Sequence, residues 1–132
     1  MKPNGTIYRL AKDKDIPILE ALVEKSLPWT DKTPFGMPTI VAETEGELVG
    51  FVARNPNADG ILTEPMVAPN GVIYMRLGDA YENALRLCGF TGKHYFRVPH
   101  VAEDQLELMH KRPTIFIPSS KDDTYHWFYR RL

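Results

Sequence analysis

The chain has 132 residues, 43% of them hydrophobic and 25% charged, which is the size and composition of one globular domain with its own core. Its net charge of −1 argues against nucleic-acid binding through bulk electrostatics, and its single cysteine excludes an internal disulfide. The N-terminal segment lacks the apolar core of a signal peptide, and no apolar run approaches the roughly 20 residues of a membrane span. We therefore expect one domain, residues 1–132, in the cytoplasm, with neither nucleic acid nor membrane as partner.

The first part of the chain predicts a strand, a helix and a long loop. Residues 6–11 alternate well enough for a short strand, and apolar residues then recur at helical spacing within 13–28. Residues 26–38 hold three prolines, a glycine and Trp29. Loops of that length are typical of binding loops or mobile covers, and the alternative is a packed surface loop with Trp29 at the core edge.

Three strands are predicted next. Residues 39–45 and 47–55 flank Gly46 and predict a hairpin, and residues 61–67 predict a further strand that contains Pro65. Proline removes one donor from the ladder of hydrogen bonds. We therefore expect this third strand to lie at an edge, to be bulged, or to be splayed from a neighbour at that point.

The clearest element is a helix between Gly71 and Gly89. Its apolar face is predicted to hold Ile73, Leu77, Ala80, Ala84 and Leu87, with Cys88 beside them as a small core residue. The opposite, polar face is predicted to hold Arg76, Asp79, Glu82, Asn83 and Arg86. A strand that runs through a short turn into a helix presents free N–H groups and the positive end of the helix dipole, which together favour an anion.

The remaining elements complete a mixed pattern. Residues 93–98 predict a strand, 102–111 a short helix, and 114–117 and 125–132 two strands around a polar turn at 119–123. Antiparallel hairpins are thus mixed with crossover helices. The predicted fold class is α/β or α+β, with a mixed sheet and helices on both faces.

Several segments, taken in order, carry a family resemblance. The strand and helix within 7–19, the acidic-Gly turn and Val-Gly-Phe strand within 42–51, the Val67-Ala68-Pro69 strand end, the helix 77–89 and the aromatic strand 125–132 resemble the GNAT superfamily of acyl-CoA-dependent N-acyltransferases. This resemblance implies a twisted, mostly antiparallel sheet with helices on both faces. It also implies acetyl transfer from acetyl-CoA to an amine of unknown identity, without a metal.

The resemblance implies a cofactor site after the fourth strand. A backbone N–H near Met66 or Val67 would polarise the thioester carbonyl, and the turn at Gly71, Val72 and Ile73 would hold the pyrophosphate. The chain departs from the family in this turn, which is several residues short and has isoleucine where a small residue is usual. Fewer amides and a β-branched side chain both weaken an anion site.

Two residues are candidates for proton transfer. Glu64 is the carboxylate placed to deprotonate an amine directly or through water, although a strand glutamate is more often a solvated outward side chain. The family's late-helix tyrosine, which protonates the leaving thiolate, corresponds to Met109 or His110, and of these only His110 can donate a proton. The four histidines have no metal-ligand spacing.

Two alternatives to an enzyme stay open. One is an inactive GNAT-fold binding or assembly protein, similar to compact members in tailed phages, which would place it in host cytoplasm or virion. The other is a module whose aromatic last strand pairs with a second copy, giving a homo-oligomer. An enzyme should show a V-shaped opening between strands at Met66 and Tyr95 with free amides at 71–73. A non-enzyme should fill that gap with Ile73, Tyr74 or Phe96.

Overall fold

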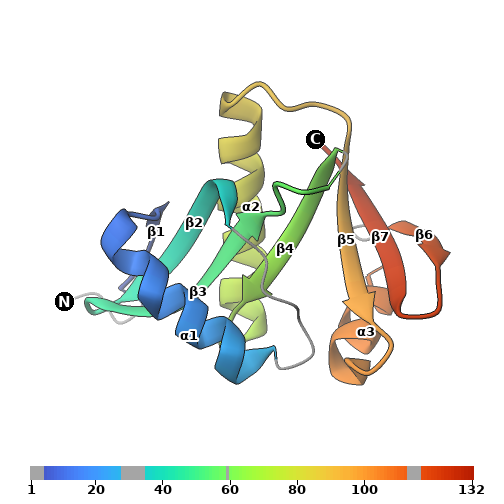
Figure 1. Ribbon diagram of the computed structural model, residues 1–132, viewed down its shortest axis with the longest axis horizontal. Coiled ribbons are helices and arrows are strands. Elements are labelled where there is room, and N and C mark those ends of the chain that lie inside the picture. Colours follow the sequence, from blue (N-terminus) through green and yellow to red (C-terminus); the bar gives the residue numbers. More distant parts are fainter. Residues whose placement is uncertain (1–4, 28–34, 59, 113–116) are drawn as a thin grey trace.

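The computed structural model describes residues 5–27, 35–58, 60–112 and 117–132 (Figure 1). Within these ranges a seven-stranded sheet carries helices on both faces, as the sequence predicts. The elements in chain order are β1 (Thr6–Leu10), a short 3-10 turn (Asp13–Asp15), α1 (Ile16–Ser26), β2 (Gly36–Thr44), β3 (Glu47–Arg54), β4 (Ile61–Val67), α2 (Gly71–Leu87), β5 (Lys93–Pro99), α3 (Glu103–His110), β6 (Ile117–Lys121) and β7 (Tyr125–Arg131).

The sheet has the strand order β1-β2-β3-β4-β5-β7-β6. Every neighbouring pair is antiparallel except β4 and β5, which are parallel. A parallel pair needs a crossover connection, and here α2 supplies it. The carboxyl ends of β4 and β5 therefore point the same way, and α2 begins directly beyond the end of β4.

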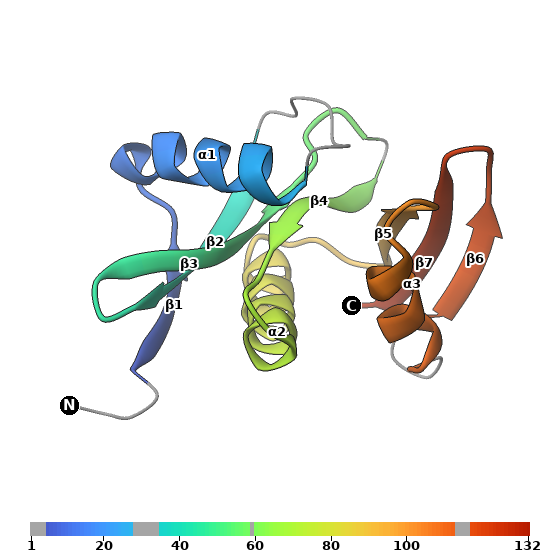
Figure 2. The same ribbon diagram turned by 90° about the horizontal axis from the view of Figure 1, so that it is seen from below.

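Each face of the sheet has its own apolar core. In Figure 2, α1 lies above the sheet and α2 below it. Leu19 of α1 packs against Phe51 of β3, whereas the inward face of α2 packs against β2 and β3 through Leu77 and Leu85. Met109 of α3 packs against β5 and β7 on the same side as α2. Among the described residues, none of the helices is both long and apolar enough to cross a membrane.

The buried face of α2 differs in part from the predicted one. The residues that face the sheet are Leu77, Gly78, Tyr81, Glu82 and Leu85. Leu87, predicted to be buried, is 89% exposed, and Glu82, predicted to be solvated, is 3% exposed. Cys88, predicted as a core residue, is exposed just beyond the end of α2. Leu77 is buried as predicted, and Ile73, Ala80 and Ala84 pack against the same core. The prediction was wrong for Leu87 and Cys88, and for Glu82, which has buried partners on the inner face.

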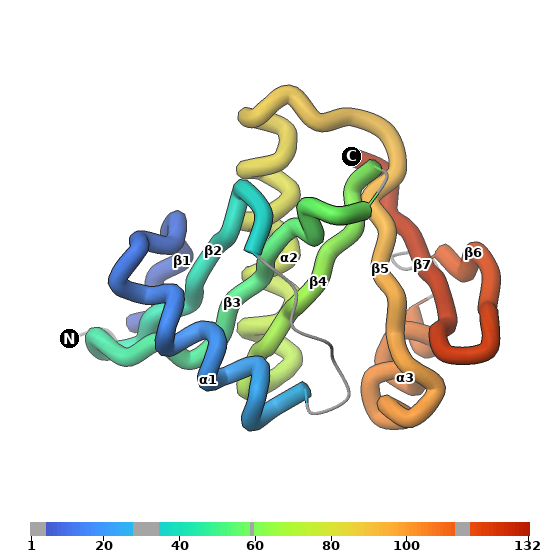
Figure 3. The backbone as a smooth tube through the Cα atoms, viewed as in Figure 1, coloured from blue at the N-terminus to red at the C-terminus, as the bar shows by residue number. Residues whose placement is uncertain are grey.

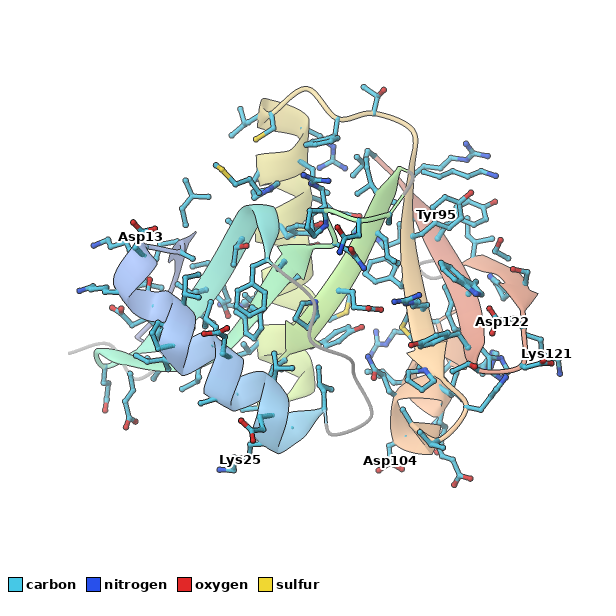
Figure 4. All side chains as sticks on the ribbon, viewed as in Figure 1. Asp13, Lys25, Tyr95, Asp104, Lys121 and Asp122 are labelled. Atoms are coloured by element: carbon cyan, nitrogen blue, oxygen red, sulfur yellow. The ribbon has the colours of Figure 1, made fainter. Side chains whose placement is uncertain are left out.

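The end of the chain also differs from prediction. The predicted strand at 114–117 lies almost wholly outside the described residues. The predicted polar turn at 119–123 is instead largely strand, because β6 extends to Lys121 and pairs with β7. Asp122 closes the shorter turn between β6 and β7 by accepting hydrogen bonds from the amides of Thr124 and Tyr125 (Figure 4).

The end of β4 is held by a close backbone approach at Gly50 of β3. A Cβ atom at this position would lie 2.5 Å from the carbonyl oxygen of Val67, which is main chain and cannot rotate away. We expect Gly50→Ala to lower the free energy of unfolding by about 1–3 kcal/mol, measured by urea titration. Gly71→Ala is the control, since a Cβ there has no neighbour within 4 Å. Equal stability of the two variants would contradict this packing.

Candidate functional site

The two parallel strands separate partway along their length. β4 and β5 are paired at only three positions, Ile61 with His94, Leu62 with Tyr95 and Thr63 with Phe96. Beyond Thr63 they diverge (Figure 3). On its other side β4 is bulged, because Thr63 and Met66 pair with Arg54 and Val52 of β3. Of the three arrangements predicted around Pro65, the structure shows the bulge and the splay, and β4 is not an edge strand.

The divergence opens a cleft at the carboxyl ends of β4 and β5. Its empty volume, including the part open to solvent, is about 480 Å³. Thr63 lies at the apex, residues 64–66 and 96–99 form the two walls, and Tyr74 of α2 and Gln105 of α3 also line it. Tyr74 and Phe96, two of the three side chains expected to fill the gap in a non-enzyme, thus form part of its walls. Carboxyl ends of strands at such a topological switch are where open α/β sheets bind ligands.

The opening begins two residues later along β5 than predicted, after Phe96. Tyr95, predicted to flank the gap, still lies on the paired part of β5 (Figure 4). The predicted Met66 does line the cleft. The register of β4 with β5 sets this point, and the sequence carries no signal for that register.

An ion pair connects the two walls of the cleft. Two guanidinium nitrogens of Arg97 on β5, Nε and Nη2, donate hydrogen bonds to the carboxylate of Glu64 on β4. The distance between Nη2 and Oε1 is 2.6 Å. Glu64 has a side chain only 12% exposed, so it is not a solvated outward residue. The hydrogen bond to Glu64 raises the pKa of Arg97 and keeps it cationic. The same guanidinium lies over the ring of Tyr125, 4.4 Å from its centroid.

The first turn of α2 offers two unpaired amides. Asn70 caps the helix, since its Oδ1 accepts a hydrogen bond from the amide of Ile73 at 2.9 Å. The amides of Gly71 and Val72 have no partner among the described residues. Of the three predicted free amides at 71–73, one is therefore occupied, and the remaining anion site is small.

The predicted site residues are only partly brought together. Glu64 and Met66 line the cleft, whereas Val67 is 8% exposed and packs in the core under α1. His110 is exposed at the end of α3, with its ring 5.3 Å from that of Phe128, and it is not among the residues that line the cleft. The structure thus does not place His110 together with Glu64.

Sequence reasoning missed a buried polar pair behind the apex, formed by Glu82 of α2 and His94 of β5. A signal for it exists. His94 alternates with Phe96 and Val98 along β5, which puts it on the buried face, and a buried imidazole needs a polar partner. Among the described residues, no group of three or more His, Cys, Asp or Glu side chains is arranged to hold a metal ion.

Comparison with known proteins identifies the fold. No protein-family model matches the sequence, and no curated protein matches it. A PaiA N-acetyltransferase from Thermoplasma acidophilum, solved with coenzyme A, is similar over 100% of both chains with a TM-score of 0.75 and 13% identity. An acetyltransferase of the GNAT family from Streptococcus pneumoniae is similar over 96% of this chain and 99% of its own, with a TM-score of 0.68 and 14% identity.

A third similar structure belongs to a longer protein. N-acetylglutamate synthase from Neisseria gonorrhoeae, solved with coenzyme A and N-acetyl-glutamate, has a TM-score of 0.67 and 19% identity. The alignment covers 99% of this chain but 36% of the synthase, so this chain spans about a third of that protein's length. The chain therefore has the GNAT fold, and the fold alone does not assign an activity.

Proposed function

We propose that this protein is an acyl-CoA-dependent N-acyltransferase that transfers an acetyl group from acetyl-CoA to an amine. The observation that supports this most is the open cleft between β4 and β5, which lies beside the N-terminus of α2. The cleft is the place where a thioester could reach protic side chains while its phosphates meet helix amides. PaiA N-acetyltransferase, which has the same fold, was solved with coenzyme A.

The cleft residues have distinct proposed roles. The amides of Gly71 and Val72 bind a phosphate, and a main-chain amide near Met66 polarises the thioester carbonyl. Glu64 accepts the proton of the amine, directly or through water, while Arg97 fixes its carboxylate. For direct transfer, Tyr74 replaces His110 as proton donor to the thiolate, because it lines the cleft and burial raises its pKa and keeps it protonated.

Acetyl-CoA should stabilise the protein against heat, and Gly71→Asp should remove that effect. At about a hundred times its dissociation constant, a ligand adds roughly 2.7 kcal/mol to the free energy of unfolding. A carboxylate at Gly71 would face the phosphates and repel them. Asn57→Asp, in the exposed turn before β4, adds the same charge at the other end of that strand and should keep the shift. Loss of the shift in both variants, or in neither, would contradict this phosphate site.

A second candidate is a GNAT-fold binding or assembly protein without turnover, such as a phage component. Two observations favour it: Asn70 occupies one amide of a turn that is already short, and Arg97 occupies the candidate base Glu64. Thermal unfolding separates the two functions. If millimolar acetyl-CoA gives no shift, the enzyme proposal fails and this second candidate is favoured.

A further inference from the structure

Four polar side chains from four elements form a buried chain behind the apex of the cleft. Oε2 of Glu82 lies 2.7 Å from Nδ1 of His94, and Nε2 of His94 is hydrogen-bonded to Oγ1 of Thr63. The second oxygen of Glu82 forms an ion pair with Arg130, whose Nη2 lies 3.0 Å away. Thr63, Glu82 and His94 are 6%, 3% and 0% exposed, so these groups are not a solvated surface network.

Chemistry fixes the direction of these hydrogen bonds. An ionised carboxylate only accepts, so Nδ1–H of His94 donates to Glu82. In the neutral ring Nε2 is then the acceptor, and the hydroxyl of Thr63 must donate to it. Burial lowers the pKa of His94, which favours this neutral ring. The imidazole therefore has the tautomer that a general base needs toward a hydroxyl.

The surrounding rings hold His94 in this orientation. Phe96 lies 4.2 Å from it and Tyr81 lies 5.3 Å from it, measured between ring centroids. Burial raises the pKa of Tyr81 to about 12, so its hydroxyl stays protonated and does not compete with His94 as a base.

Of these four hydrogen-bonded or ion-paired side chains, that of Thr63 belongs to a residue that lines the cleft, and β4 and β5 separate directly after it. We propose that Thr63 is a nucleophile that accepts the acyl group of a thioester or an activated ester, with His94 as its base and Glu82 as the group that orients His94. This adds a covalent acyl-enzyme route, with slow ester and thioester hydrolysis, to the direct transfer described above. It rests on the proposed function only for the identity of the natural donor.

The steps balance as follows. Oγ of Thr63 attacks the carbonyl carbon while its proton passes to Nε2 of His94; the bond from carbon to the leaving sulfur or oxygen breaks, and the leaving group takes that proton. Thr63 then carries the acyl group as an ester. Water or an amine attacks this ester and gives a proton to Nε2, the bond to Oγ breaks, and Oγ takes the proton back.

The test uses para-nitrophenyl acetate and the full-length chain, followed by intact mass measurement and peptide mapping. We expect one acetyl group on Thr63 and nitrophenol release from the wild type. Thr63→Val, which keeps the shape and removes the hydroxyl, should slow release by about 10²-fold or more, and Thr63→Ser should restore the reaction. Circular dichroism of each variant verifies folding. Acetylation elsewhere only, or none in folded wild type, would overturn the proposal.

The pH profile separates a base from a purely structural histidine. The groups that face His94 are Thr63 from β4, Tyr81, Glu82 and Arg86 from α2, and Arg130 from β7. The reaction needs neutral His94, so its rate should rise with pH and level off below the ordinary histidine pKa of about 6.5. A rate that keeps rising in proportion to hydroxide would overturn the role of His94.

The two proposals fail separately. Acetylation of Thr63 by the nitrophenyl ester, without a thermal shift by acetyl-CoA, would support the nucleophile and overturn the acyl-CoA function. A thermal shift by acetyl-CoA without an acetyl group on Thr63 would support the acyl-CoA function and overturn the role of Thr63 as a nucleophile.

Discussion

Glu82→Ala is expected to lower the free energy of unfolding by about 1–3 kcal/mol, the range for leaving a buried hydrogen-bonding group without its partner. The change takes the acceptor away from both His94 and Arg130, at 2.7 Å and 3.0 Å. His94 is fully buried, so its Nδ1–H would have no water to replace the lost carboxylate. Arg130, with a side chain 20% exposed, would lose less because it can turn toward solvent.

Asp79→Ala is the matched control for this prediction. Asp79 lies on the same helix and is near the same Arg130 nitrogen, but at 3.8 Å and with a side chain 69% exposed. Exposed pairs contribute about 0–1 kcal/mol, so this variant should unfold almost as the wild type does. Urea titration of both variants measures the difference. A loss below 1 kcal/mol for Glu82→Ala would mean that the buried pair does not stabilise the sheet.

The order and limits of the elements were largely predictable from the sequence. β4 has its predicted bounds, and Pro65 marked both the bulge and the splay, because a missing donor is a local property that the sequence states directly. Periodicity predicted most of the packed face of α2 but not the burial of Glu82, because glutamate counts as polar in any pattern although its partners on β5 and β7 bury it. The contacts of Glu82 with His94 and Arg130, which are distant in sequence, place it on the inner face of α2.

The candidate site was predictable in place and less so in its residues. The cleft lies where the strand-to-helix turn and Pro65 pointed, and Glu64 is in its wall. Arg97 was missed because its pairing with Glu64 depends on the register between β4 and β5, which pattern reasoning does not supply. His110 was placed by its position in a helix, but the direction of that helix relative to the cleft follows from packing alone.

At Asn70, helix capping competes with anion binding for the free amides at the N-terminus of α2. As a helix cap it stabilises α2 by about 1 kcal/mol, and it does so by taking an amide that an anion would use. An enzyme with this turn therefore depends on fewer phosphate contacts. If the proposed function holds, affinity for acetyl-CoA comes more from the cleft than from the helix end.

Glu64→Gln is expected to lower kcat/KM for acetyl transfer by about 10²–10⁴-fold, the usual contribution of a general base. The amide has nearly the shape of the carboxylate but cannot accept a proton from the amine. Acetyl-CoA binding should persist, since no phosphate contact is changed. The measurements are steady-state kinetics with a panel of amines and the thermal shift with acetyl-CoA.

Glu43→Gln is the matched control for the base. Glu43 is a strand glutamate on β2 that also binds an arginine, Arg9, at 2.9 Å, and it is not among the residues that line the cleft. Its variant should lose part of an ion pair and keep full activity. If Glu64→Gln and Glu43→Gln behave alike in kinetics, then Glu64 serves only to bridge the two diverging strands through Arg97. A loss confined to Glu64→Gln, with the thermal shift intact, places the proton acceptor in the wall of the cleft.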